Sequence, residues 1–448
     1  MKLKPGETVI CKTLDPYRIR WLIENNKDRF KEIFLIDLDR EDRIYTYRDG
    51  EFKQLKIKKK LEDGLEEVIK PEIGAFMSKH LPKNEPALVI IKGFASYEDY
   101  YDAFYSGIGY ESDSKHAIAF MTPNPPTPSF IKVVDLMFAS PEEAKAYKPR
   151  DVPLEKWLQA TKGLTLGEVV KLASSKGDVM KEAKEIKLNR LSSMGLRTEK
   201  SPSLRELPGF HAYKKLLSNL SGRETLLFYG PPGAGKTTLA KAVVRQYCGE
   251  VLVTEASTLF KQTEDVKRLL EFILESLLNF SGIGVVINEI ELAAQADPTA
   301  LSSFLKFLEA EKDIMICMTT SKLEELDPQL IRSGRIDDAI IVLPPLDIRE
   351  RIEIIQHLCR ENNITPEPRS TLLYLAAETK YMYPSEIATI LKKYARTGAT
   401  NLANRKTLNK VLSETKHQTA GRIAEINEYL ENYQSKFSLP NILASYLR

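Results

Sequence analysis

Short apolar runs separated by polar and helical segments recur through the first third of the chain. Five such runs lie at residues 8–11, 32–36, 87–91, 117–121 and 131–138. Residues 16–24 have helical character, and residues 43–56 alternate around Asp49-Gly50, a pair typical of a tight hairpin turn. Strands that alternate with helical segments predict an α/β domain over residues 1–150, with a sheet that we expect to be parallel.

A second series of strands begins near residue 226. The apolar runs at residues 226–229, 251–253, 283–290 and 313–318 predict strands. Apolar residues at helical spacing predict an amphipathic helix over residues 265–278. Between the two series, residues 151–205 predict a helical linker that ends in a polar stretch at 197–205.

Residues 230–238 read Gly-Pro-Pro-Gly-Ala-Gly-Lys-Thr-Thr and fit the pattern G-x-x-x-x-G-K-[ST] at every fixed position. An apolar strand precedes them and a helical segment at 239–244 follows, so a chance match in an ordinary βα turn is the weaker explanation. Backbone N–H groups and the helix N-terminus form a cradle for phosphate. We expect Lys236 to reach the β- and γ-phosphates of ATP and Thr237 to bind Mg²⁺.

The strand at 283–290 carries the polar pair Asn288-Glu289 near its end. An apolar strand that ends in two polar residues downstream of a phosphate loop is the Walker B arrangement, in which the pair is usually Asp-Glu. Glu289 is placed to orient and activate the attacking water, whereas a plain buried strand would explain the apolar residues but not Glu289. Asn288 keeps an oxygen but lacks the charge of Asp, so we expect a lower Mg²⁺ affinity and slow hydrolysis. Asn288→Asp is expected to raise hydrolysis or to lower the Mg²⁺ requirement.

Two polar segments follow the strand at 313–318. A side chain of Thr319-Thr320-Ser321 can touch the γ-phosphate or the attacking water, although a cap or turn hydroxyl is an equally good explanation. Residues 326–337 carry Arg332 and Arg335. Such a pair can reach the γ-phosphate of a neighbouring subunit as arginine fingers, or can form surface ion pairs.

These segments together resemble the AAA+ ATPases. The run at 326–337 is similar to the "second region of homology" of that family, and the resemblance extends from residue 207 to the C-terminus. It implies a RecA-like core at 206–345, a helical lid with a C-terminal helix at 346–448, and usually a homo-oligomeric ring or spiral of six subunits.

By position, the resemblance makes Glu289 the catalytic base, places Ser321 at the sensor-1 position, and makes Arg332 and Arg335 the fingers that act on the next subunit. The nucleotide-binding positions it implies are Pro208, Gly209, Pro231, Pro232, Gly233, Ala234, Gly235, Lys236, Thr237 and Thr238. The metal positions it implies are Thr237 and Asn288, and the cofactors are ATP and Mg²⁺.

The order of motifs at 163–168, 187–196 and 207–210 resembles a plastid- and cyanobacteria-encoded AAA family with a degenerate RecA-like domain in front of one ATPase domain. Residues 12–16 follow the first strand without a glycine loop, and Lys92-Gly93 stand where an ATPase would place acidic residues. The first domain is therefore expected to be an inactive copy of the second, kept for structure or for partner binding.

The sequence also departs from the AAA+ pattern. Ser321 replaces the usual Asn, and residues 383–387 replace a glycine-rich lid turn. Residues 259–262 lack the glycine of a substrate-gripping pore loop, so Phe260 is the one candidate there, and a core contact explains it equally well.

Bulk composition narrows the function classes. A chain of 448 residues is too long to fold around one hydrophobic core, so we expect two or three domains. The net charge of +3 does not indicate a nucleic-acid partner. Four widely separated cysteines predict reduced thiols rather than a metal site or disulfides. No signal-peptide pattern opens the chain and no apolar run approaches the about 20 residues that span a bilayer, which predicts a cytoplasmic protein with no membrane partner.

The sequence thus predicts an ATPase that remodels an unknown macromolecular partner. The alternatives are a nucleotide-gated scaffold that hydrolyses ATP slowly, and a DNA-handling motor.

Overall fold

The computed structural model describes most of the chain. The described residues are 1–4, 7–13, 15–37, 43–55, 58–60, 66–68, 81, 85–92, 116–122, 132–260, 266–280, 282–295, 298–309, 314–331, 334–416 and 421–438. They form two compact units, Met1–Lys187 and Leu188–Arg448, and helix α7 (Val179–Ser193) contains the boundary between them. Each unit is taken by itself below.

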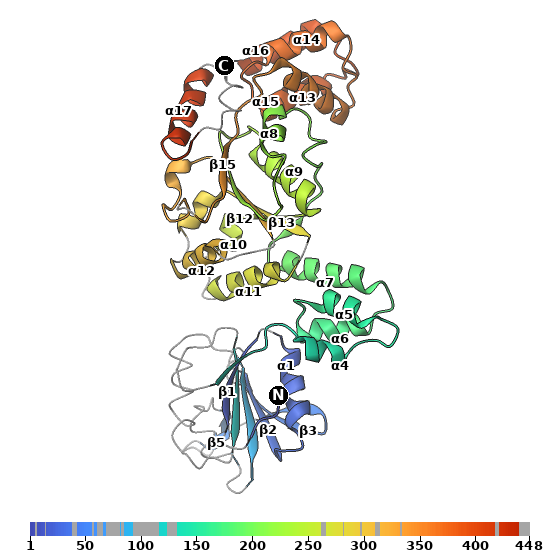
Figure 1. Cartoon of the computed structure of the whole chain (residues 1–448), viewed down its shortest axis with the longest axis vertical. Coiled ribbons are helices and arrows are strands. Elements are labelled where there is room, and N and C mark those ends of the chain that lie inside the picture. Colours follow the sequence, from blue (N-terminus) through green and yellow to red (C-terminus); the bar gives the residue numbers. More distant parts are fainter. Residues whose placement is uncertain are drawn as a thin grey trace. The chain divides into compact units, whose positions relative to one another are not determined.

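The N-terminal unit contains a sheet of mixed direction (Figure 1). Its described strands, in the spatial order β4-β3-β2-β7-β8-β1-β9, are β4 (Glu51–Leu55), β3 (Arg43–Arg48), β2 (Glu32–Asp37), β7 (Ala87–Lys92), β8 (Ala117–Thr122), β1 (Thr8–Lys12) and β9 (Lys132–Asp135). The strands from β2 to β9 in this order are parallel, as predicted, whereas β3 and β4 add an antiparallel hairpin. Asp49 and Gly50 turn the hairpin with φ of 55° and 83°, which confirms the predicted turn. A separate short pair joins β5 (Lys58–Lys60) to β6 (Glu66–Val68).

Helix α1 (Tyr17–Asn26) covers one face of this sheet (Figure 1). Its Ile19, Leu22 and Ile23 share a buried cluster with alternate residues of the parallel strands, because successive strand side chains point to opposite faces. A second, smaller core surrounds Trp157, whose indole N–H donates to the Ala144 carbonyl at 2.6 Å. Helices α4 (Pro141–Ala146), α5 (Leu154–Thr161), α6 (Leu166–Ala173) and the first turns of α7 build that core.

The C-terminal unit contains a second sheet, with α9 (Lys236–Cys248) on one face (Figure 1). Its described strands, in the spatial order β10-β12-β13-β14-β11-β15, are β10 (Arg197–Thr198), β12 (Glu250–Glu255), β13 (Ile283–Asn288), β14 (Met315–Thr320), β11 (Thr225–Tyr229) and β15 (Asp338–Ile341). All are parallel except β10, which pairs antiparallel with β12. The sequence predicted only a polar linker at 197–205, so β10 is a correction: two residues carry no period from which a strand could be recognised.

Other helices connect these strands. They are α8 (His211–Leu216), α10 (Ala256–Leu259), α11 (Val266–Leu278), α12 (Pro298–Glu309) and the 3₁₀ turns η2 (Ile290–Gln295) and η3 (Leu323–Glu325). Phe260, the pore-loop candidate, is 4% exposed and meets Phe304 edge-to-face with ring centroids 5.4 Å apart. Phe260 is therefore a core residue in this structure, and residues 261–265 lie outside the described part.

The parallel strands of the two sheets correspond position by position. In chain order, β1, β2, β7, β8 and β9 have 5, 6, 6, 6 and 4 residues, as do β11, β12, β13, β14 and β15. Their spatial order is the same, and so is their register. The last residues of the second and third strands are partners in both sheets: Asp37 with Lys92, and Glu255 with Asn288.

Helices α13 (Ile348–Glu361), α14 (Arg369–Glu378), α15 (Pro384–Ala395) and α16 (Arg405–Lys416) share a core of their own, which is the helical region expected after the second sheet. Two helices, α16 and α17 (Arg422–Gln434), stand where the sequence predicted one C-terminal helix after the lid. Helix α16 belongs to the lid core, whereas α17 packs on the second sheet's core, where the Tyr433 hydroxyl donates to Ala339 O at 2.6 Å. Phe437, which follows α17, contacts Tyr433.

The sequence also led to expectations about the cysteines and about membrane-spanning helices. All four cysteines are free, as predicted, and Cys11, Cys317 and Cys359 are buried. Within the described ranges, no helix combines the length and the apolar character that crossing a membrane requires.

Candidate nucleotide site

The predicted phosphate loop, residues 230–235, joins β11 to α9 at the carboxyl edge of the second sheet. A Cβ on Gly230 would lie 2.2 Å from the Val342 carbonyl oxygen, so only glycine fits beside β15. Gly235 has φ of 99°, and a Cβ there would lie 2.9 Å from the Phe210 ring. The glycines that the motif requires are therefore explained by close backbone approach and by left-handed geometry.

Lys236 is the first residue of α9, and its ammonium lies over the loop. Its Nζ donates to the carbonyls of Gly230 at 2.7 Å and Pro231 at 3.0 Å. Burial lowers the pKa of Lys236 to about 8, and the negative charges of Glu291 and Glu289 oppose that shift. In the rest of the loop, Pro231 and Ala234 are buried, Gly235 is half-buried, and Pro232, Gly233 and Thr238 are exposed.

One asparagine joins three elements at the same edge. Asn288, at the end of β13, accepts through its Oδ1 from the hydroxyl of Thr237 at 2.9 Å and from that of Thr319 at 3.1 Å. Its Nδ2 donates to Glu255 Oε1 at 3.1 Å. The two predicted metal positions, Thr237 and Asn288, are thus in direct contact, with a carboxylate next to them.

Glu289 and Ser321 also lie at this edge. Glu289 is exposed and has φ of 54°, a left-handed conformation that costs a non-glycine residue free energy. Glu291, in η2, is only 7% exposed, and its Oε2 is buried without a hydrogen-bond partner. Its Oε1 is 3.5 Å from both the backbone N and the hydroxyl of Ser321, so the predicted sensor residue contacts Glu291.

Pro208-Gly209 lie against the lid helix α13. The Gly209 N–H donates to Glu353 Oε2 at 2.8 Å, and His211 Nε2 is 3.0 Å from Glu353 Oε1. The cavity lined by Phe210, Tyr213, Ile354 and their neighbours has a volume of about 10 Å³, which is room for about one water molecule. This cavity is therefore too small for a nucleobase.

The lid also touches the phosphate loop. The Ser385 N–H donates to the Gly233 carbonyl at 3.4 Å, and a Cβ on Gly233 would lie 2.1 Å from Ser385 Oγ. The segment at 383–387, which departs from the glycine-rich lid turn, is thus packed on the loop.

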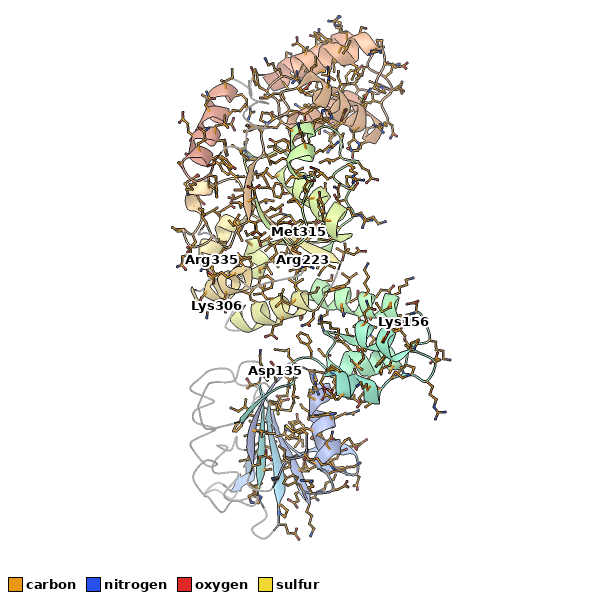
Figure 2. The ribbon with its side chains drawn as sticks, in the orientation of Figure 1. Asp135, Lys156, Arg223, Lys306, Met315 and Arg335 are labelled. Atoms are coloured by element: carbon orange, nitrogen blue, oxygen red, sulfur yellow. The ribbon has the colours of Figure 1, made fainter. Side chains whose placement is uncertain are left out.

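Of the two arginines predicted as fingers, the structure describes Arg335, whereas Arg332 lies outside the described residues. Figure 2 labels Arg335 in the C-terminal unit. Arg335 Nε donates to Glu309 Oε1 at 2.8 Å, and a second guanidinium nitrogen is 2.7 Å from the same oxygen. Arg335 also donates to the Gln329 carbonyl. The side chain of Arg335 is 12% exposed. In this chain Arg335 therefore makes an ion pair, which is the second role that the sequence left open.

Sequence reasoning missed two acidic residues of the site. Glu255 ends β12 next to Asn288, and its position at the carboxyl end of a parallel strand was a signal that could have been used. Glu291 follows Glu289 by two residues, but only the structure shows that the 3₁₀ turn η2 buries it.

The donors fit a phosphate-bound Mg²⁺. Hydroxyl, amide and carboxylate oxygens are the ligands that Mg²⁺ prefers, and it usually takes one or two protein groups together with substrate phosphates. In the described part of the chain, no group of three or more His, Cys, Asp or Glu is arranged to hold a metal by itself. The arrangement is thus suited to a metal that arrives with a nucleotide.

Comparisons with known proteins bear on this site. Residues 226–343 match the model of the family described as "ATPase family associated with various cellular activities (AAA)". The 26S proteasome regulatory subunit 8 homolog of Saccharomyces cerevisiae is 30% identical over 175 residues, which is 36% of this chain and 43% of that protein. The subunit 4 homolog of Dictyostelium discoideum is 26% identical over 268 residues, which is 56% of this chain and 58% of that protein. The chain thus spans less than two thirds of the length of these relatives.

Among solved structures, the FIGL-1 AAA domain aligns with a TM-score of 0.46 and 16% identity, and covers 57% of this chain and 97% of that one. A structure titled "Structural Basis for Katanin Self-Assembly" aligns with a TM-score of 0.42 and 18% identity, and covers 55% of this chain and 96% of that one.

Proposed function

We propose that this protein binds ATP·Mg²⁺ at the carboxyl edge of its second sheet and hydrolyses it to remodel a macromolecular partner. The match of residues 226–343 to the AAA family model supports the proposal. The observation that carries the proposal is the contact of Thr237 and Thr319 with Asn288 beside the loop that holds Lys236. Lys236 would bind the β- and γ-phosphates, and Thr237 and Asn288 would hold Mg²⁺. Glu289 would orient the attacking water, with Ser321 close to the γ-phosphate.

We further propose that the N-terminal unit is a degenerate RecA-like domain, as in the plastid- and cyanobacteria-encoded family that the whole chain resembles. Its five parallel strands have the same lengths, spatial order and register as the five parallel strands of the second sheet, which supports this assignment. We assign it a structural or partner-binding role, in a cytoplasmic protein.

The active unit in this proposal is a homo-oligomer, with a ring or spiral of six subunits as the expected form. Arg332 would act on the γ-phosphate of the neighbouring subunit, and Arg335 would do so only after leaving Glu309. An arginine finger contributes roughly 10³–10⁵ in rate in known GTPases, so a monomer should be nearly inert.

The test is ATP turnover as subunits assemble. Specific activity should rise with protein concentration. Mixing Arg335→Ala subunits, whose own site is intact, with Lys236→Ala subunits, whose arginines are intact, should recover turnover, and Arg332→Ala is run in parallel. Activity that is independent of concentration, with no rescue by either mixture, would remove the intersubunit mechanism. A wild-type protein that binds no ATP would remove the function itself.

A nucleotide-gated scaffold with slow hydrolysis is the second candidate. The burial of Phe260 favours it, because the one aromatic candidate for gripping a substrate lies in the core. ATP turnover measured with and without proteins captured by a Glu289→Gln variant separates the two candidates: a remodeller is stimulated by its partner, and a scaffold is not. The third candidate, a DNA-handling motor, would require binding to DNA that weakens steeply with salt.

A further inference from the structure

The amide of Asn288 lies between the predicted metal position and a carboxylate. Its oxygen accepts from two hydroxyls, those of Thr237 at 2.9 Å and Thr319 at 3.1 Å. With the oxygen so engaged, the amide nitrogen faces the neighbouring strand and donates to Glu255 at 3.1 Å. Aspartate at this position has no N–H to donate, so the contact with Glu255 exists only because residue 288 is Asn.

We propose that Glu255 supplies the negative charge of the Mg²⁺ site that Asn288 lacks, and that the Asn288 amide holds the Glu255 carboxylate in place for this role. The inference rests on the proposed ATP·Mg²⁺ site. In place of a Walker B aspartate at the end of β13, the negative charge is then carried by a residue at the end of the neighbouring strand β12. Glu255 is then a positioning residue that acts on the metal through Asn288 and the water around it.

The first sheet contains the same pair with a different charge. Asp37 and Lys92 occupy the positions of Glu255 and Asn288, and Lys92 Nζ is 3.1 Å from Asp37 Oδ2. The register of the parallel strands therefore brings a carboxylate to the side chain at the end of the next strand in both units. In the first unit the ammonium neutralises the carboxylate, whereas in the second unit the neutral amide leaves one negative charge for a cation.

The pair also explains why Asn288→Asp is not the most informative substitution. That change would place two carboxylates side by side, at about the 3.1 Å that now separates Asn288 from Glu255. The informative change exchanges the two residue types, so that the charge returns to β13 and the amide moves to β12. The double variant is Glu255→Gln with Asn288→Asp.

The experiment measures metal affinity rather than turnover. Mn²⁺ stands in for Mg²⁺, because both prefer oxygen ligands and Mn²⁺ is detected by paramagnetic resonance. The dissociation constant of Mn²⁺ is measured on the full chain with a non-hydrolysable ATP analogue, for wild type, Glu255→Gln and the double variant. Glu250→Gln is the matched control, since it removes one carboxylate from the opposite end of the same strand. ADP affinity without metal and the thermal unfolding midpoint show whether the loop and the fold remain intact.

Glu255→Gln should weaken Mn²⁺ binding by about tenfold or more, with metal-free ADP affinity retained. The double variant should return to within about threefold of wild type, and Glu250→Gln should not change the constant. Asn288→Lys, which copies the Asp37–Lys92 pair, should remove most of the Mn²⁺ binding.

Wild-type Mn²⁺ affinity in Glu255→Gln would overturn the inference, and so would a weakened affinity that the double variant does not restore. In both cases the wild-type protein would still bind the nucleotide, so the proposed function would stand. A wild-type protein that binds no ATP analogue would overturn the proposed function and this inference with it.

Discussion

The carboxyl edges of the two sheets show how one strand framework supports different chemistry. The five parallel strands agree in length, order and register, so the backbone presents the same positions at both edges. The loop after the first strand differs completely. In the second unit, the Gly230 and Pro231 carbonyls of this loop accept from the Lys236 ammonium. In the first unit, the corresponding segment is residues 13–16 and contains no glycine.

The shorter loop carries a carboxylate, whereas the longer one lies under an ammonium. Asp15, which is 7% exposed, accepts from the Tyr17 N–H at 3.0 Å and from the Gly167 N–H at 2.8 Å. Gly167 lies in the first turn of α6, so Asp15 satisfies free N–H groups at two helix N-termini. A carboxylate in this position repels phosphate and instead attaches α6 to the loop.

Helix α1 then adds a buried cation that is already paired. Arg18 is fully buried, pairs with Glu143, and donates to the carbonyls of Leu136 at 3.1 Å and Phe138 at 3.0 Å. Among the described residues, the hydrogen-bond partners of Lys236 at the start of α9 are two carbonyls, which bound phosphates can replace. Strand register thus sets where side chains lie at both edges, whereas we expect the first βα loop to decide whether an anion can bind.

The largest expected effect is on ATP affinity at the phosphate loop of the second sheet. Lys236→Ala should reduce ATP affinity by about 100-fold or more, because two charge-assisted hydrogen bonds of roughly 1.5–3 kcal/mol each are lost. Titration calorimetry measures the affinity. Lys92→Ala, at the end of β7 in the first sheet, is the matched control and should leave the affinity unchanged. An equal loss in both variants would mean that the two edges do not differ as described.

Arg18→Leu should destabilise the N-terminal unit by about 3 kcal/mol or more, because it leaves Glu143 partly buried without its cation. The chain has two tryptophans, Trp21 and Trp157, and both lie in that unit, so tryptophan fluorescence during urea unfolding reports on it alone. ATP binding by the C-terminal unit should persist. An unchanged fluorescence midpoint would show that the buried ion pair is not what stabilises the first unit.

Asp15→Ala should lower the free energy of unfolding of the N-terminal unit by a smaller amount, about 1–2 kcal/mol, since a side-chain cap on helix N–H groups is lost. The same fluorescence experiment measures the loss, and Asp28→Ala, at an exposed position of the same unit, is a control for removal of a carboxylate. If ATP began to bind at the first edge in Asp15→Ala, the carboxylate alone would have been what excluded phosphate.

The smallest expected effect is a pH dependence of ATP affinity at the carboxyl edge of the second sheet. Burial lowers the pKa of Lys236 to about 8, and bound phosphates raise that pKa again, because an opposite charge favours the ammonium. Above pH 8 the free site must therefore take up a proton to bind ATP, so affinity should fall with rising pH by at most about tenfold per pH unit. Calorimetry at pH 9 in buffers of different ionisation enthalpy detects the uptake. Lys236→Arg, which stays charged, should show neither the uptake nor the pH dependence; a wild type without proton uptake would contradict the shift.

The sequence by itself determined the local features of this protein. Apolar runs of three to eight residues predicted the parallel strands other than β15, because burial on both faces requires such runs. The spacing of glycines, lysine and threonine at 230–238 predicted the phosphate loop, because those constraints act between residues that are close in the chain. The same reasoning predicted the hairpin at Asp49-Gly50.

Only the tertiary structure decided which distant residues meet. Parallel pairing of β12 with β13 brings Glu255 to Asn288, which is 33 residues away. Packing of α6 brings Gly167 to Asp15 across 152 residues, and η2 buries Glu291 beside Ser321. These contacts depend on strand order and register, which follow from the packing of whole elements and leave no period or motif in the local sequence.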